Sequence, residues 1–172
     1  MNSKVTHINV GNLAENCWFL ANEDTKEAVV IDPGAEPDRI CAAAEKHGWK
    51  ITAILLTHGH IDHMGACESL RTELGVKVYA LTEEEDLLLD AKKNLSVFIE
   101  RKVVTFEPDE LLRDGQELTL AGMKIQVIHT PGHTPGGCSY YVADAGCVFS
   151  GDTVFAESVG RSDFPGGSTS AL

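Results

Sequence analysis

The sequence crowds three histidines and an aspartate into six consecutive positions, directly after an apolar run. The segment THGHIDHMG contains His58, His60, Asp62 and His63. The run before it, residues 51–56, is β-branched and apolar, which predicts a buried strand. Imidazole nitrogens and carboxylate oxygens suit zinc, iron or manganese, whereas a structural zinc site more often uses thiolates. The pattern therefore predicts a metal centre in the loop after a strand.

The spacing of this cluster divides it in two. Alternate side chains of an extended segment point the same way, so His58 and His60 are expected to converge on one point and Asp62 and His63 on another. An isolated histidine is more often a packing or surface residue. A chain with seven histidines in 172 residues would rarely assemble H-x-H-x-D-H by chance. Two adjacent metal sites are therefore expected.

Two further segments place histidine or aspartate where predicted strands end. In IHTPGHTPGG, the Pro-Gly turn presents His133 from the loop, and His133 is the predicted third ligand of the first metal. His129 is interpreted as a packing or supporting residue, because only one of two histidines four residues apart in a turn is expected to face the site. In FSGDTVF, Asp152 would bridge two metals through its two carboxylate oxygens.

The remaining polar candidates receive simpler interpretations. Asp32 ends a strand in VVIDPG and is expected to hydrogen-bond a ligand or hold a loop. His7 and His47 lie outside any cluster, in a strand and at a helix end. The acidic run 83–85 after Thr82 is interpreted as the solvated first turn of an N-capped helix.

Composition limits the class of protein. At 172 residues, one domain spanning residues 1–172 is expected. The net charge of −12 opposes binding to nucleic acid, and no apolar run approaches the roughly 20 residues that span a bilayer. Five cysteines without C-x-x-C spacing argue against a disulfide framework and a zinc ribbon. The start lacks signal-peptide features, which predicts a cytoplasmic protein. The oligomeric state is left open.

Short strands and a few helices must position these residues. Apolar patterning and turn residues predict strands at 5–10, 17–20, 28–31, 51–56, 76–81, 118–120, 123–128, 138–142 and 146–150. Helical spacing predicts helices over 36–47, over 65–74, and from Thr82 through Phe98. Helices interspersed in both halves imply two sheets with helices outside. Loops at the carboxyl ends of strands are where such folds place their chemistry.

Three motifs together resemble those of the metallo-β-lactamase-fold hydrolases: T-H-x-H-x-D-H at 57–63, P-G-H-T-P-G at 131–136 and S-G-D at 150–152. Within that superfamily, D-P-G at 32–34, H-T-P-G-H-T-P-G-G at 129–137 and G-R-S-D-F-P-G-G at 160–167 resemble the glyoxalase II (hydroxyacylglutathione hydrolase) branch, especially its short bacterial members. The resemblance implies an α/β fold, a four-layer αβ/βα sandwich with the metal site at the edge between two sheets.

The resemblance also implies a set of ligands. His58, His60 and His133 would hold the first metal, and Asp62, His63 and a bridging Asp152 the second. Two zinc ions are expected, with iron or manganese as alternatives. Arg161 falls where the family places a basic residue near the glutathione carboxylate. A surface ion pair with Asp163 or Glu157 is an equal alternative for Arg161.

The family pattern has one more histidine, in a G-H-G-like segment after the helix that follows F-P-G-G. The sequence ends at Leu172 before such a segment. We therefore expect a C-terminally truncated member in which residues 168–172 begin that helix, and in which a strand and one or two helices are missing. A true end at Leu172 would leave the second site one ligand short.

The implied activity is metal-dependent hydrolysis of a small-molecule thioester such as a hydroxyacylglutathione. Two cations about 3.5–4 Å apart would bridge a water and bring its pKa toward about 7, which makes hydroxide available. Asp62 is the expected catalytic carboxylate that orients this water. A metal would polarise the carbonyl group, and a thiolate with a pKa near about 8.5 needs no dedicated acid to leave.

Three alternatives remain open at this point. A mononuclear-iron sulfur dioxygenase would share the loop motifs and would consume oxygen. A lactone, ester or β-lactam hydrolase would share the site and differ in its pocket. An inactive, truncated metal-binding module is the third alternative, favoured by the missing histidine.

Overall fold

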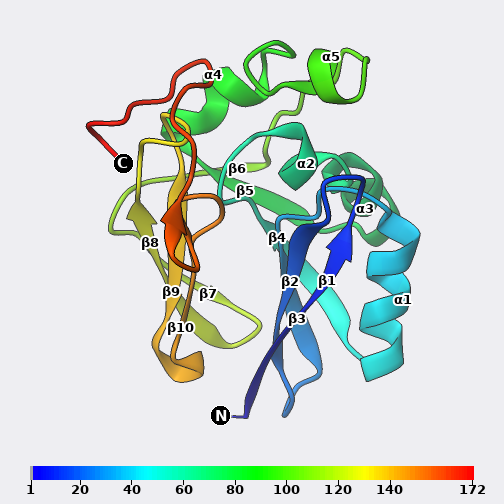
Figure 1. The fold of residues 1–172 in the computed structure, drawn as a ribbon. Coiled ribbons are helices and arrows are strands. Elements are labelled where there is room, and N and C mark those ends of the chain that lie inside the picture. Colours follow the sequence, from blue (N-terminus) through cyan, green and yellow to red (C-terminus); the bar gives the residue numbers. More distant parts are fainter. Residues whose placement is uncertain (1) are drawn as a thin grey trace.

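The computed structural model describes residues 2–172 and contains two β-sheets that enclose a shared apolar core (Figure 1). The first sheet has the order β1-β2-β3-β4-β5-β6, and its strands are β1 (Ser3–Val10), β2 (Glu15–Asn22), β3 (Glu27–Ile31), β4 (Lys50–Leu55), β5 (Lys77–Leu81) and β6 (Glu110–Leu112). The second has the order β10-β9-β8-β7, formed by β7 (Glu117–Leu120), β8 (Met123–His129), β9 (Cys138–Val142) and β10 (Cys147–Phe149). A hairpin of β11 (Val154–Phe155) and β12 (Ser158–Val159) follows.

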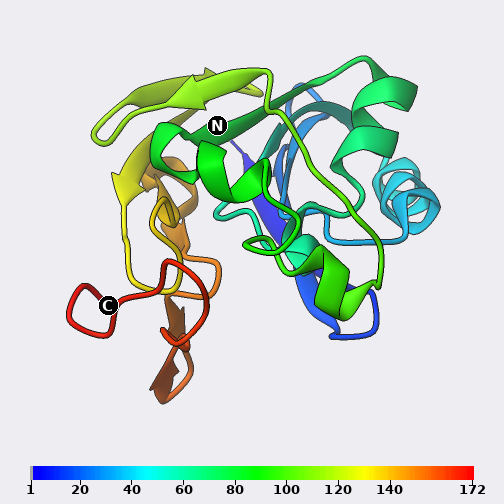
Figure 2. The ribbon, with the colours of Figure 1, turned by 90° about the horizontal axis from the view of Figure 1, so that it is seen from above.

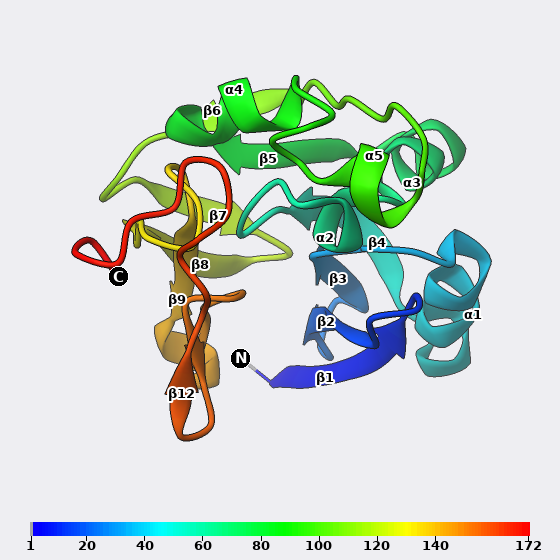
Figure 3. The same ribbon diagram turned by 45° about the horizontal axis from the view of Figure 1, so that its top comes forward.

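Most helices lie between strands of the first sheet along the chain. They are α1 (Pro37–His47), α2 (Ile61–Met64), α3 (Cys67–Leu74), α4 (Glu85–Leu88) and α5 (Ser96–Ile99), with the 3₁₀ turns η1 (Thr82–Glu84) and η2 (Ala143–Ala145). In the view from above, α1 and α3 lie on the side of the first sheet away from the second sheet (Figure 2). The segments α2, α4 and α5 gather at one end of the molecule (Figures 1 and 3).

The central strands are buried on both faces, and their side chains alternate between two apolar layers. In β3, Ala28 and Val30 pack with α1 and α3, whereas Val29 and Ile31 face the second sheet. All four are fully buried. This is why the strand reads as a continuous apolar run, as strands covered on both faces do.

The second sheet buries one face against the first. Along β8, Met123, Ile125 and Val127 are buried between the sheets, while Lys124 and Gln126 are exposed. Among the described residues after β6, the helical segments amount to the one turn η2, so the helices expected in the second half are not found there. The α/β sandwich itself is confirmed, with helices, first sheet and second sheet as its layers.

The direction of the strands determines where loops meet. Strands β1, β2 and β3 are antiparallel, whereas β3, β4, β5 and β6 run parallel to one another. The carboxyl ends of β3, β4 and β5 therefore share one edge of the sheet. The first residues after these three strand ends are Asp32, Leu56 and Thr82, respectively.

Most of the elements predicted from the sequence are confirmed within a few residues at their ends. Gly48 and Gly75 end α1 and α3 in the left-handed conformation that glycine adopts easily. Residues 168–172 form one hydrogen-bonded turn, in which the Leu172 amide donates to the Ser168 carbonyl at 3.1 Å. The short strands β6, β11 and β12 were not predicted. The five cysteines are unpaired, and Cys17, Cys67 and Cys138 are buried.

The helix predicted from Thr82 through Phe98 is wrong, because side chains compete for its backbone groups. Asp90 accepts hydrogen bonds from the amides of Lys92 and Lys93 at 2.9 and 3.2 Å. Leu95 takes a φ of 68°, which no helix tolerates. The segment is therefore split into η1, α4, an irregular turn and α5. Thr82 does not cap a helix either, since its hydroxyl donates to the Leu112 carbonyl at 2.8 Å.

None of the helices in residues 2–172 combines the length and the apolar character needed to cross a bilayer.

Asn94 organises this irregular turn, and we predict that Asn94→Ala destabilises the protein. The buried side chain donates to the carbonyls of Leu88 and Val104 and accepts from the Ser96 amide. Its loss leaves buried backbone groups unpaired and should lower the free energy of unfolding by about 1–3 kcal/mol. Urea unfolding measures the change. Asn16→Ala, at an exposed position, serves as control; equal stabilities of the two variants would contradict the prediction.

Candidate metal centre

Three histidines from two loops form the first cluster. The side chains of His58, His60 and His133 each offer a ring nitrogen, and these three atoms lie within 4.8 Å of one another. His58 and His60 follow β4, whereas His133 lies between β8 and β9 of the other sheet. His60 Nδ1 lies 3.0 Å from His133 Nε2. The convergence predicted for these three residues is thus present, across 73 residues of sequence between His60 and His133.

Two nitrogens of this cluster have nothing to bind within residues 2–172. The Nε2 atoms of His58 and His60 are buried and lack a hydrogen-bond partner there. Buried polar atoms are nearly always paired, so each exception needs a physical explanation. A cation that accepts both lone pairs provides one, and neutral imidazoles are common ligands of divalent metals. This donor set fits a metal ion.

Hydrogen bonds orient the rings for such a role. His133 Nδ1 donates to the Arg161 carbonyl at 2.7 Å, so the Nε2 atom of His133 carries the lone pair, and His60 Nδ1 faces it at 3.0 Å. The Thr57 hydroxyl donates to Asp32 Oδ2 at 2.6 Å and can therefore accept from His58 Nδ1 at 3.2 Å. That leaves the lone pair of His58 on Nε2. Both rings are thus held in the tautomer that presents Nε2 to the cluster.

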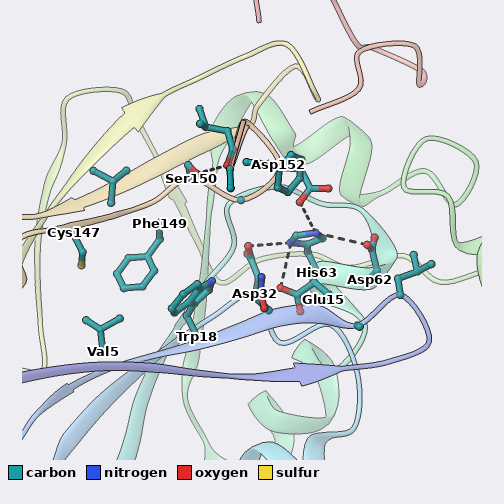
Figure 4. A pocket seen from close by; sticks show the side chains of 18 residues that line it. Val5, Glu15, Trp18, Asp32, Asp62, His63, Cys147, Phe149, Ser150 and Asp152 are labelled. Atoms are coloured by element: carbon teal, nitrogen blue, oxygen red, sulfur yellow. Dashed lines mark hydrogen bonds and ion pairs between the residues drawn. The ribbon is translucent and has the colours of Figure 1, made fainter. Parts of the chain in front are cut away.

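The second cluster surrounds His63 (Figure 4). The Nε2 atom of His63 lies 3.3 Å from Asp152 Oδ1 and 3.7 Å from Asp62 Oδ2. The other oxygen of Asp152 lies 3.6 Å from His133 Nε2. The Asp152 carboxylate therefore stands between the two clusters, with one oxygen toward each. The bridging of two metals by Asp152 stays a prediction, and this geometry leaves one oxygen available on each side.

Asp32 supports both clusters. Its Oδ2 atom lies 3.0 Å from His63 Nδ1, and its Oδ1 atom accepts the Thr57 amide at 2.7 Å. Asp32 has a φ of 53°, in the left-handed region that non-glycine residues rarely adopt. Such strain occurs where the surroundings determine the backbone, often at functional sites. The expectation that Asp32 bonds a candidate ligand and holds a loop agrees with this geometry, which also groups Asp32 with His58 and His63 within 4.8 Å.

Burial and neighbouring charges divide the histidines into two electrostatic types. Burial lowers the pKa of His58 well below its usual value and lowers the pKa of His60 to about 3. Both rings therefore remain neutral, as ligands must be. Burial also acts to lower the pKa of His63, but hydrogen bonds to Asp152 and Asp32 outweigh it and raise the pKa. His63 thus balances the carboxylates that surround it.

Glu15 is a buried acid that the sequence interpretation missed. Its side chain is 5% exposed, and its Oε1 atom lies 3.8 Å from His63 Nδ1. Burial raises the pKa of Glu15 to about 9, so this carboxyl group is uncharged at neutral pH. A signal was present in β2, because Glu15 alternates in phase with the buried residues Cys17 and Phe19.

The interpretation of the acidic run 83–85 as a solvated face is wrong for Glu84. Glu83 is exposed, but Glu84 is 1% exposed. Its Oε1 atom accepts the Gly59 amide at 2.7 Å, and its Oε2 atom accepts the Gly136 amide at 2.8 Å. Glu84 thereby connects the two histidine-bearing loops. Sequence patterning could not reveal these contacts, because they depend on two glycines far away in the chain.

Two cavities adjoin the clusters. The larger has a volume of about 510 Å³, and the acidic side chains of Glu15, Asp62 and Asp152 line it together with the apolar rings of Trp18 and Phe149 (Figure 4). The smaller has a volume of about 280 Å³ and is lined by His60 and His133 together with Leu95, Ile99, Phe155, Arg161 and Phe164. Both cavities include Asp62 and Asp152. A bound molecule would therefore meet these carboxylates from either side.

Arg161 lies at the rim of the smaller cavity. Its guanidinium forms two hydrogen bonds of 2.7 Å with Asp163 and stacks on the Phe164 ring at 4.0 Å. The surface ion pair with Asp163, one of the two interpretations of Arg161, is present. His129 lies outside the cluster and bonds the Pro135 carbonyl at 2.8 Å, in agreement with its supporting role. His47 stacks on Trp49, and the His7 ring lies tilted against Trp18 at a centroid distance of 4.6 Å.

Comparison with known proteins gives a consistent result. The model of the metallo-beta-lactamase superfamily matches residues 10–172. The chain is 38% identical over 164 residues to a probable metallo-hydrolase of Bacillus subtilis, covering 95% of this chain and 77% of that protein. It is 34% identical over 160 residues to the hydroxyacylglutathione hydrolase GloC of Haemophilus influenzae, covering 92% and 75%.

Solved structures show the same similarity. BLEG-1, a B3 metallo-beta-lactamase, matches with a TM-score of 0.91 and 36% identity, over 98% of this chain and 81% of that one. TTHA1623 in a di-iron-bound form matches with a TM-score of 0.84 and 35% identity, over 96% and 81%. ETHE1 from Myxococcus xanthus matches with a TM-score of 0.74 and 27% identity, over 99% and 66%.

We predict that His133→Ala lowers zinc affinity and that His129→Ala does not. The two histidines are four residues apart, but His133 belongs to the triplet whereas the ring of His129 bonds the Pro135 carbonyl. Loss of a direct ligand should weaken binding at least as much as loss of a supporting residue, by about 100-fold or more. Competition with a zinc chelator measures the affinity. Equal zinc affinity in the two variants would refute the triplet as a metal site.

Proposed function

We propose a thioester hydrolase activity for this chain because it belongs to the metallo-beta-lactamase superfamily, whose members include metal-dependent hydrolases similar to it. The proposed substrate is a small thioester such as a hydroxyacylglutathione. The observation that carries the proposal is the triplet His58, His60 and His133 beside Asp152, in which the buried Nε2 atoms of His58 and His60 lack a hydrogen-bond partner within residues 2–172. The similarity to a hydroxyacylglutathione hydrolase supports the substrate class.

The donor set supports a site for two divalent cations. We assign His58, His60 and His133 to the first and Asp62, His63 and a bridging Asp152 to the second. When bound, such cations lower the pKa of a coordinated water and polarise a substrate carbonyl. Zinc suits these nitrogen and oxygen donors, and the di-iron-bound form of a similar structure keeps iron as an alternative.

Asp62 is the proposed catalytic carboxylate. Its side chain is 22% exposed and lines both cavities, so it can reach a water beside the substrate. A carboxylate there accepts a hydrogen bond from this water and orients its lone pair toward the carbonyl carbon. Asp32 bonds Nδ1 of the neighbouring His63 and so keeps the Nε2 atom of that ring directed toward Asp62 and Asp152. The leaving thiolate requires no protonated residue, because the pKa of its thiol is about 8.5.

The two cavities offer room for both parts of a thioester. Apolar side chains of Leu95, Ile99, Phe155 and Phe164 line the smaller one and would contact the hydrocarbon part of the substrate. Arg161 is the proposed partner of a substrate carboxylate. Its ion pair with Asp163 is exposed, so exchanging that partner for a substrate carboxylate costs little.

Hydrolysis of a β-lactam is the second candidate function. It is favoured by the likeness to the B3 metallo-beta-lactamase BLEG-1 over nearly the whole chain. A β-lactam amide and a thioester place similar demands on a polarised carbonyl and an oriented water. The two differ in the leaving group, because an amine requires a proton as it departs.

We predict that Asp62→Asn lowers kcat for S-D-lactoylglutathione by about 10²–10⁴-fold, the range expected for a positioned acid–base group. The amide cannot take up a proton, although it keeps the volume of the side chain. Asp144→Asn, at an exposed position in η2, is the control and should behave as wild type. Wild-type kcat in Asp62→Asn would remove Asp62 from the mechanism. A protein that cleaves a β-lactam but no thioester would establish the second candidate instead.

We predict that Arg161→Ala raises KM for S-D-lactoylglutathione about tenfold and leaves kcat nearly unchanged. Arg161 would bind a part of the substrate that does not react, and one charge-assisted hydrogen bond accounts for a loss of this size. The KM for a thioester without a carboxylate should not change. If KM for the anionic substrate is unaffected as well, Arg161 is a surface ion-pair residue and nothing more.

A further inference from the structure

The candidate metal centre requires two loops from different sheets to keep a fixed distance from each other. His58 and His60 belong to the loop after β4, and His133 belongs to the loop between β8 and β9. Their ring nitrogens lie within 4.8 Å of one another, although no covalent link joins the loops near the site. A displacement of 1 Å between the loops would spoil a ligand set. Some contact must therefore set their spacing.

Glu84 makes contact with both loops at once. It lies at the end of η1, just beyond the carboxyl end of β5, and its side chain is fully enclosed. One carboxylate oxygen accepts the Gly59 amide at 2.7 Å, between the two histidines of the first loop. The other accepts the Gly136 amide at 2.8 Å, three residues after His133. The two oxygens of a single carboxylate therefore connect the two loops next to the histidines.

The packing around both glycines shows that the loops press against the segment that carries Glu84. A Cβ atom on Gly136 would lie 2.1 Å from the Glu84 backbone nitrogen. A Cβ atom on Gly59 would lie 2.7 Å from the Leu88 side chain, in α4. Each loop is thus in direct contact with residues 83–88, and any larger residue would push it away. Both the hydrogen bonds and the close packing act on the same two positions.

A carboxylate suits this place better than other polar groups. The glycine amides are both donors, so the bridging group must accept at both ends, and a carboxylate has acceptors only. A glutamine of the same length would turn its NH₂ group toward one of the two amides, where donor would face donor. An aspartate would be one methylene too short to reach both loops. Charge-assisted hydrogen bonds are also the stronger kind, which favours a precise spacing.

We infer that Glu84 is a positioning residue for the candidate metal centre. By accepting one amide hydrogen bond from each loop, it holds the loops of His58, His60 and His133 at the distance required for metal binding. It does not touch the metal or the substrate. This inference rests on the proposed metal centre, and it names a residue that acts on that centre through the backbone of two glycines.

The test compares Glu84→Gln with Glu83→Gln. The two residues are neighbours in η1, and the exposed Glu83 makes no contact with either glycine amide through its side chain, so the change in charge is matched. We expect Glu84→Gln to bind zinc 10- to 100-fold more weakly, about the effect known for residues that orient ligands. The affinity is measured by chelator competition. The visible absorption of the cobalt-loaded protein reports the ligand geometry and should change in Glu84→Gln alone.

A purely structural role makes a different prediction. In that case Glu84→Gln would unfold at a lower temperature yet keep wild-type zinc affinity and the wild-type cobalt spectrum, and this result would overturn the inference. If Glu84→Gln does not fold, Glu84→Asp replaces it. The shorter acid retains the charge but reaches one loop only, so wild-type zinc affinity in Glu84→Asp would also overturn the inference.

The same measurements separate this inference from the metal centre itself. If wild type and His133→Ala bind zinc equally, the metal centre fails and the inference fails with it. If His133→Ala loses zinc while Glu84→Gln matches wild type, the metal centre stands and the positioning role of Glu84 is refuted.

Discussion

Within residues 2–172, two buried imidazole nitrogens of the candidate metal centre lack a hydrogen-bond partner, and this constraint explains how the site is built. Leaving His58 Nε2 and His60 Nε2 unpaired inside the protein costs free energy, yet the fold buries both rings beside His133. A cation relieves this cost, because it accepts the lone pairs that no donor within residues 2–172 occupies. The Arg161 carbonyl orients the ring of His133, and the Thr57 hydroxyl, held by the Asp32 carboxylate, orients the ring of His58. The folded protein therefore bears the free-energy penalty of these unpaired nitrogens before a cation binds.

The sandwich provides the rigidity for this arrangement. The apolar layers on both faces of β3 and β4 hold the strand ends in place, so the loops that leave them start from defined positions. Cross-sheet hydrogen bonds then join the two halves, since the Tyr140 hydroxyl donates to the Leu56 carbonyl at 2.6 Å and the Cys138 amide donates to the Thr57 carbonyl at 2.8 Å. Beyond these, Glu84 connects the loop tips themselves. The site is built on ordered strands and finished by buried polar contacts.

Local signals made much of this predictable. The continuous apolar run of β3 and the alternation along β8 identified strands, and H-x-H-x-D-H with the two later loops identified the residues that converge. The errors arose where a distant partner decides the outcome. Glu84 is buried because two remote glycine amides bond it, and Glu15 because β2 turns it toward His63. The helix predicted from Thr82 through Phe98 failed because Asp90 and Asn94 bond the backbone in place of helical partners. Such contacts leave no periodic trace in a sequence.

Anomalous scattering from a crystal of the zinc-loaded protein tests directly whether the three histidines hold a metal ion. The account predicts two peaks. One lies within about 2.1 Å of nitrogens from His58, His60 and His133, and the other beside Asp62 and His63, with an oxygen of Asp152 reaching each. Absence of a peak among the three histidines, or zinc bound only elsewhere on the surface, would contradict the account.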